Sequence, residues 1–85
     1  MLKAIIIDDE ENARITLASL LGSYAPEIEI VAQCANVPEG VLAINKHNPD
    51  IVFLDVEMPE YNGFELLKFF KEISFEIIFV TDCRQ

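Results

Sequence analysis

Four short apolar runs, separated by segments with helical spacing, constrain the fold of this chain more than any other feature. The runs are rich in β-branched residues and too short for typical helices, so they predict strands that are buried on both faces. They cover residues 2–7, 28–35, 51–55 and 76–81. Strands that alternate with helices imply right-handed crossovers, and therefore a parallel sheet with helices on both of its faces.

Three helices are expected between these runs. Apolar positions with a helical period predict the first helix over residues 11–24, which ends before Pro26. An Asn that precedes a Glu by three residues is a capping signal, and it predicts where the second and third helices begin. The two pairs are Asn36 with Glu39, and Asn62 with Glu65. The second helix is expected to run to about Asn48, and the third to carry Leu66, Leu67, Phe70 and Ile73. We interpret Leu66, Phe69 and Phe70 as core residues.

The composition excludes several classes of function. Fifteen acidic and six basic side chains give a formal net charge of -9, so phosphate backbones and anionic lipid surfaces should repel the chain. Direct binding to nucleic acid or to a membrane is therefore not expected. No stretch approaches the length of a membrane span, and the N-terminus reaches acidic residues too soon for a signal peptide. A cytoplasmic location is expected.

Polar side chains with functional chemistry lie at the ends of the predicted strands. They are Asp8 and Asp9 after the first strand, Asp55 at the end of the third, and Thr81 at the end of the fourth. In parallel α/β sheets the ligand crevice lies outside the carboxyl ends of the strands, so these side chains should lie close together.

Three carboxylates at one end of a sheet repel one another unless a cation binds or one of them takes up a proton. Hard oxygen ligands favour Mg²⁺, which typically shares its coordination shell with a phosphate. The alternative is structural: Asp8 or Asp9 would cap the first helix, and Asp55 would satisfy a turn.

The chain resembles the receiver domain of bacterial two-component response regulators in the segments IIIDDEENAR, DIVFLDVEMPEYNGFELL and EIIFVT. The most specific part of the resemblance is the pattern LDxxMPxxxG, formed by Leu54, Asp55, Met58, Pro59 and Gly63. The resemblance implies a doubly wound, flavodoxin-like α/β fold with the strand order 2-1-3-4. The form VEMPEYNGFELL is most similar to receivers that precede a LytTR-type DNA-binding domain.

The resemblance also implies a role for each candidate site residue. Asp55 would accept a phosphoryl group from a sensor histidine kinase, with Mg²⁺ as the cofactor. Asp9 would bind the metal directly, Asp8 through a water molecule, and Glu57 through its backbone carbonyl. Thr81 would contact a phosphoryl oxygen and change orientation when the domain switches. Such a domain is not an enzyme, because it catalyses at most its own phosphorylation and dephosphorylation.

The chain departs from the family's pattern after Thr81. Receivers continue into a further helix, strand and helix, and their fifth strand carries a lysine that pairs with the phosphoryl group. The single domain, residues 1–85, is therefore expected to lack this last segment and to be incomplete at its C-terminus. Its fourth strand would then be a bare sheet edge of high β propensity, which predicts a homodimer through that edge. Asp82 places a charge where receivers usually carry a small neutral residue.

The two cysteines, Cys34 and Cys83, have no CxxC spacing, and we interpret them as reduced structural thiols. In the strand order 2-1-3-4 they lie on opposite edges of the sheet. With strands about 4.8 Å apart their separation is about 14 Å, so no disulfide is expected. His47 is interpreted as a solvated surface residue and not as a metal ligand.

Two other functions remain open at the level of sequence. A degenerate receiver-like interaction module could bind a partner without phosphotransfer, and the missing lysine keeps that alternative open. The segment Asp55-Val56-Glu57 also resembles the DxD motif of haloacid-dehalogenase-type phosphatases, although that family places the motif on its first strand. Labelling that depends on Mg²⁺ and stops would favour a receiver, whereas turnover of a phosphomonoester would favour a phosphatase.

Overall fold

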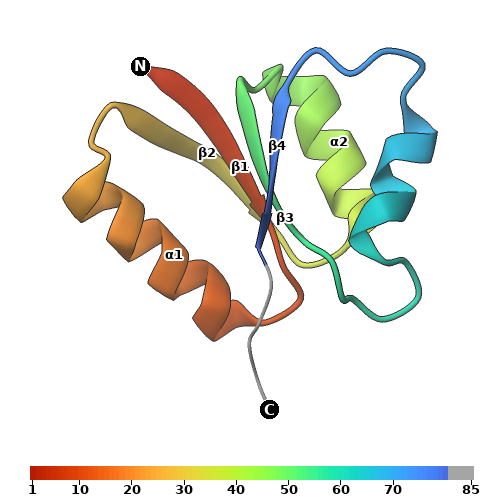
Figure 1. Ribbon diagram of the computed structural model, residues 1–85, viewed down its shortest axis with the longest axis horizontal. Helices are drawn as coiled ribbons and strands as arrows, with labels where there is room; N and C mark the ends of the chain where they lie inside the picture. Colours follow the sequence, from red (N-terminus) through yellow and green to blue (C-terminus); the bar gives the residue numbers. More distant parts are fainter. Residues whose placement is uncertain (81–85) are drawn as a thin grey trace.

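The computed structural model describes residues 1–80, and strands alternate with helices along that part of the chain (Figure 1). The elements are β1 (Leu2–Ile7), α1 (Glu11–Tyr24), β2 (Ile28–Cys34), α2 (Val37–His47), β3 (Ile51–Asp55), the 3₁₀ helix η1 (Gly63–Phe69) and β4 (Glu76–Val80). All strand pairs are parallel, in the order β2-β1-β3-β4. The predicted doubly wound fold and its strand order are confirmed.

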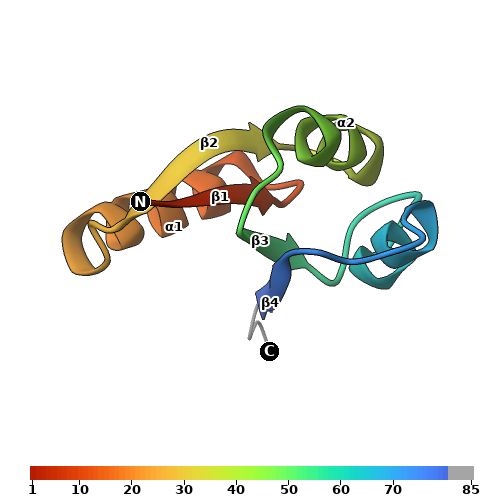
Figure 2. The ribbon, with the colours of Figure 1, turned by 90° about the horizontal axis from the view of Figure 1, so that it is seen from above.

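The helices form two layers on opposite faces of the sheet. Figure 2 shows α1 against one face, and α2 and η1 against the other. Successive residues of a strand point to opposite faces, so β1 supplies core side chains to both sides. Ile5 and Ile7 belong to the cluster that includes α2 and η1 residues, whereas Ala4 and Ile6 pack with side chains of α1. The sheet is therefore the central layer, and the carboxyl ends of its strands lie together on one side.

Helix α2 begins as its capping box predicts. The Asn36 side chain accepts a hydrogen bond from the backbone N–H of Glu39 at 2.9 Å. In return, the Glu39 carboxylate accepts one from the backbone N–H of Ala35 at 3.0 Å. Asn48 ends the helix in the left-handed conformation, with a φ of 47°. Local sequence chemistry therefore sets both ends of this helix.

The prediction of a third α-helix that carries Ile73 is wrong. The 3₁₀ helix η1 ends at Phe69, and Phe70 after it is extended, with φ -125° and ψ 132°. Leu66 is buried as predicted, but Phe69 is 51% exposed and is not a core residue. The ring of Phe70 instead packs edge-on against buried Phe75, with 5.5 Å between the ring centroids. The helical pattern of the sequence thus continues past Phe69, whereas the helix does not, and Phe70 makes a tertiary contact there instead.

The second strand ends at Cys34, one residue earlier than predicted. The fourth is described to Val80, so the predictions for Thr81, Asp82 and Cys83 lie outside the described residues. Cys34 is buried, and this burial raises the pKa of its thiol to about 11, as befits a structural cysteine. Among residues 1–80, no helix has the length and apolar character that crossing a bilayer requires.

Candidate functional site

Three aspartates lie together at the carboxyl end of the sheet. Asp8 and Asp9 follow β1 and Asp55 ends β3, and these two strands are neighbours in which Ile7 pairs with Leu54. One carboxylate oxygen of each aspartate lies within 4.8 Å of the other two. Asp9 is exposed, Asp8 is half-buried and Asp55 is buried. The structure thus brings together the three carboxylates that the sequence places at strand ends.

Burial dominates the electrostatics of Asp55, which is only 8% exposed. The pKa of its carboxyl group is raised from 3.8 to about 6, chiefly by the loss of hydration and also by the nearby carboxylates of Asp8 and Asp9. The backbone N–H of Glu57 donates a hydrogen bond to Oδ1 of Asp55 at 3.1 Å, which acts in the opposite direction. The ionised form of Asp55 is therefore costly in the folded protein unless a positive charge is close by.

The turn between β1 and α1 fixes the backbone of the acidic pair. Oδ1 of Asp8 accepts a hydrogen bond from the backbone N–H of Glu10 at 2.9 Å, and Arg14 donates from Nη1 to the backbone oxygen of Asp8 at 2.7 Å. Glu10 is the N-cap residue of α1, and no side chain caps the helix. The alternative that Asp8 or Asp9 caps α1 is therefore wrong. Asp55, however, does accept a turn hydrogen bond, from Glu57.

The loop between β3 and η1 passes very close to the backbone of Asp55. The N–H of Gly63 donates to the carbonyl oxygen of Val56 at 2.8 Å. A Cβ at position 63 would collide with the backbone oxygen of Asp55, so only glycine fits there without a shift. Asn62 caps η1 by accepting a hydrogen bond from the N–H of Glu65 at 3.1 Å. The spacing from the aspartate to the glycine in the LDxxMPxxxG pattern thus has a direct structural cause.

The donor set fits a hard divalent cation. Three carboxylates offer oxygen atoms at close range, and oxygen ligands of this kind favour Mg²⁺ over softer metals. Glu57 lies two residues after Asp55, with an exposed side chain. The predicted role of its backbone carbonyl remains a prediction.

Sequence reasoning missed two features of this region. One is the contact between Arg14 and the backbone of Asp8, which needs a side chain to reach back across a turn. The other is a pocket beside Asp9 whose wall includes Glu60 and Leu42. Nothing in the sequence separates Leu42 from the other apolar residues of its helix. Its exposure of 72% is visible only in the structure.

The comparisons with known proteins agree on one family. Residues 4–85 match the response regulator receiver domain. An uncharacterised response regulatory protein of Vibrio cholerae is 46% identical over 82 residues, which are 95% of this chain and 34% of that protein. The transcriptional regulatory protein BtsR of Escherichia coli is 43% identical over 67 residues, which are 79% of this chain and 28% of BtsR. The chain therefore spans about a third of the length of the curated relatives it matches.

A solved structure agrees with the sequence matches. The crystal structure of a CheX–CheY complex with BeF3 and Mg²⁺ from Borrelia burgdorferi contains a chain that superimposes with a TM-score of 0.80 at 27% identity. The match covers 94% of this chain and 61% of that chain.

Proposed function

Since this chain belongs to the family of response regulator receiver domains, we propose that it accepts a phosphoryl group on Asp55 from a sensor histidine kinase. The placement of Asp55 carries this proposal. Its carboxylate is buried at the end of β3, and two further carboxylates lie within 4.8 Å. A residue that only satisfied a turn would not need that crowding, which costs free energy in the ionised state.

In the proposed step, a carboxylate oxygen of Asp55 forms a bond to phosphorus. The bond between phosphorus and the imidazole nitrogen of the donor histidine breaks, and its electron pair stays on that nitrogen. The N–H of Glu57, 3.1 Å from Oδ1, holds the Asp55 carboxylate in orientation. Phosphoryl transfer depends chiefly on such positioning and on the neutralisation of oxygen charge.

Mg²⁺ is the cofactor that fits the three aspartates. When bound, it supplies the positive charge that offsets repulsion between Asp55 and the phosphoryl oxygens. We assign Asp9 and Asp55 as direct ligands, Asp8 as a ligand through water, and Glu57 as a ligand through its backbone carbonyl. The Mg²⁺ and BeF3 in the CheX–CheY complex support this assignment by similarity. Thr81 is proposed to contact a phosphoryl oxygen and to act as the switch residue.

The wider role follows from the relatives. Because they include the transcriptional regulatory protein BtsR, we propose that phosphorylation of this domain controls transcription through another part of a longer protein. A LytTR-type output domain, a cytoplasmic location and a homodimer through β4 remain predictions. The phosphatase interpretation loses its support, because Asp55 and Glu57 lie at the end of the third strand of a receiver-family chain.

The proposal is tested by incubating the 85-residue chain with acetyl phosphate, with Mg²⁺ or with EDTA, and weighing the intact protein by mass spectrometry. We expect a gain of one phosphoryl group per chain in Mg²⁺ and none in EDTA. Asp55→Asn should stay unlabelled. Glu29→Gln removes the same single negative charge, but from an exposed position on β2. This control variant should be labelled like the parent chain.

Other results would point elsewhere. Continued release of phosphate from phenyl phosphate, without accumulation of a labelled chain, would indicate a phosphatase. If the folded chain is never labelled in Mg²⁺, the better interpretation is a degenerate receiver that binds a partner without phosphotransfer.

A further inference from the structure

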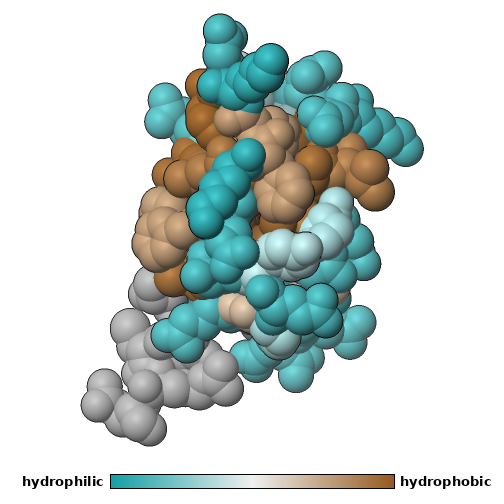
Figure 3. All heavy atoms as spheres, turned by 90° about the vertical axis from the view of Figure 1, so that its right-hand side faces the viewer, coloured by the Kyte–Doolittle hydropathy of each residue, from teal (hydrophilic) through white to brown (hydrophobic). Residues whose placement is uncertain are grey.

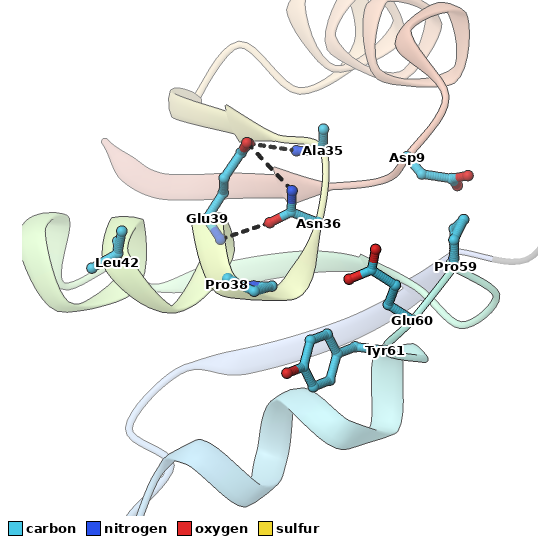
Figure 4. A pocket seen from close by; sticks show the side chains of 9 residues that line it. All are labelled: Asp9, Ala35, Asn36, Pro38, Glu39, Leu42, Pro59, Glu60 and Tyr61. Carbon is cyan, nitrogen blue, oxygen red and sulfur yellow. Dashed lines mark hydrogen bonds between the residues drawn. The ribbon is translucent and has the colours of Figure 1, made fainter.

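An open pocket of about 440 Å³ lies beside the acidic cluster, and of its lining residues the proposed phosphotransfer uses only Asp9. Figure 4 shows its two walls. Pro38 and Leu42 of α2 form one, and Pro59, Glu60 and Tyr61 of the β3–η1 loop form the other. Asp9 lies at the end nearest the acidic cluster. The pocket therefore joins α2 to the loop that follows the phosphoacceptor.

The walls are largely apolar. Leu42 is 72% exposed, although it is a large apolar side chain on a regular helix. Tyr61 stands opposite, supported edge-on by Phe69 with 6.1 Å between the ring centroids. An apolar group placed between Leu42 and Tyr61 would remove both from water, and such burial is favourable in proportion to the area covered.

The charge of the pocket is wholly negative. Asp9, Glu39 and Glu60 line it, and none of the described residues that line it is basic. The Glu39 carboxylate is held by the backbone N–H of Ala35 at 3.0 Å and the side-chain amide of Asn36 at 3.4 Å. In the described part of the chain, by contrast, the Glu60 carboxylate makes no hydrogen bond, and Figure 4 shows it pointing into the pocket. A cationic group is the complementary ligand for Glu60.

The backbone also sets Glu60 apart. Its φ of 69° lies in the left-handed region, which a glutamate adopts less readily than glycine. The turn at Glu60 directs the carboxylate toward α2, across the pocket (Figure 4).

We propose that this pocket docks a segment of a partner protein in which an arginine or lysine is next to an apolar side chain. The cation pairs with Glu60, and the apolar side chain packs between Leu42 and Tyr61. A partner of this chemistry suits the net charge of -9, which favours basic partners over acidic ones. The docked segment lies beside the acidic cluster, because Asp9 lines the pocket together with Pro59 and Glu60 of the β3–η1 loop. Docking itself needs no phosphoryl group, so it can be tested separately from phosphotransfer.

The test titrates the ¹⁵N-labelled 85-residue chain with the dipeptide acetyl-Leu-Arg-amide and follows the amide NMR signals. We expect signals of α2 near Leu42 and of Glu60 and Tyr61 to shift at millimolar peptide. Acetyl-Leu-citrulline-amide has nearly the same shape without the charge. It should bind about three-fold more weakly, as expected for one partly exposed ion pair. Equal affinity for the two peptides, or no shift at these residues, would overturn the proposal.

Matched variants locate the contacts. Glu60→Gln should reduce the affinity for the arginine peptide to that for the citrulline peptide. Glu72→Gln removes the same charge from an exposed position outside the pocket and should change nothing. Leu42→Ala should weaken both peptides, whereas Leu20→Ala, at an exposed position on α1, should weaken neither. If the control variants weaken binding as much as the pocket variants, the site lies elsewhere.

Discussion

At the scale of the residue, Asp55 determines how the stability of the metal-free domain depends on pH. The pKa of its carboxyl is about 6 in the folded chain, against 3.8 for an unperturbed group, chiefly because the side chain is buried. The folded state therefore binds this proton more tightly than the unfolded chain does. The contribution of Asp55 to stability is greatest below pH 3.8 and falls as the pH rises to about 6.

We predict that, in EDTA, the Asp55→Asn variant does not show this loss of stability with rising pH. The free energy of unfolding should fall between acidic and neutral pH by on the order of 3 kcal/mol more in the parent chain than in the variant. Urea titrations at several pH values measure the difference. Parallel pH profiles for the two proteins would show that Asp55 is not buried in an acidic cluster.

Mg²⁺ should reverse this destabilisation at neutral pH. A ligand that binds only the folded chain stabilises it by about 1.4 kcal/mol at ten times its dissociation constant. We therefore expect the melting temperature to rise with millimolar Mg²⁺, and to rise less in Asp55→Asn. The same melting temperature with and without Mg²⁺, in both proteins, would argue against the metal site.

The three carboxylates of the site could be found from sequence because each lies at a strand end, and the carboxyl ends of parallel strands meet on one side. The role of Arg14 and the pocket at Glu60 could not. Both features depend on how side chains reach across loops, and the hydrophobic pattern of a sequence carries no information about that. Thr81 is placed at a strand end by the same argument, but its role as the switch residue comes only through the resemblance.

At the scale of the element, the tight passage of the β3–η1 loop over β3 should make Gly63 indispensable. We predict that Gly63→Ala destabilises the chain by about 1–3 kcal/mol, because its Cβ would collide with the backbone oxygen of Asp55. Since that backbone carries Asp55, Mg²⁺ affinity should fall as well.

Gly22→Ala is the matched control. Gly22 lies in α1, and apart from its chain neighbours and the backbone of its own helix no atom lies within 4 Å of the position that a Cβ would take there. Alanine should therefore be tolerated at this position and add up to about 1 kcal/mol of helix stability. Urea denaturation of the two variants gives the comparison. Equal stability of Gly63→Ala and Gly22→Ala would contradict the close approach at Gly63.

Most helices and strands could be predicted from local sequence signals, and η1 is the exception. The capping pair at Asn36 and Glu39 gave the start of α2 because a cap is a local interaction. The same signal at Asn62 is real, yet it starts a 3₁₀ helix and not an α-helix. Directly after η1, Phe70 is extended and its ring packs on Phe75, and a local capping signal does not encode such a contact. The strand order likewise came from the resemblance and not from the hydrophobic pattern.

At the scale of the whole molecule, β4 has one described neighbour, β3, and it exposes apolar side chains. Ile78 is 46% exposed and Phe79 41%, while Phe64 of η1 packs against Phe79 and is itself 54% exposed. Figure 3, which faces the side of the molecule with α2 and η1, shows further hydrophobic side chains exposed in its upper half. Exposed strand edges of this kind favour pairing with another chain.

We predict that the 85-residue chain self-associates through β4 at micromolar concentration. Ile78→Lys places a charge at an exposed position on β4 and should shift the chain to monomer, whereas Leu20→Lys on α1 should not. Analytical ultracentrifugation distinguishes the two states. A stable, cooperatively folded monomer of the parent chain would contradict the prediction.

The most direct test of the central claim is to locate the phosphoryl group after labelling in Mg²⁺. Reduction of the acyl phosphate with borohydride converts the labelled aspartate into homoserine, which peptide mass spectrometry can place in the chain. We predict homoserine at position 55 alone, the buried carboxylate among the three. Homoserine at position 8 or 9 instead, or no homoserine in a chain that gained mass, would contradict the assignment of Asp55 as the phosphoacceptor.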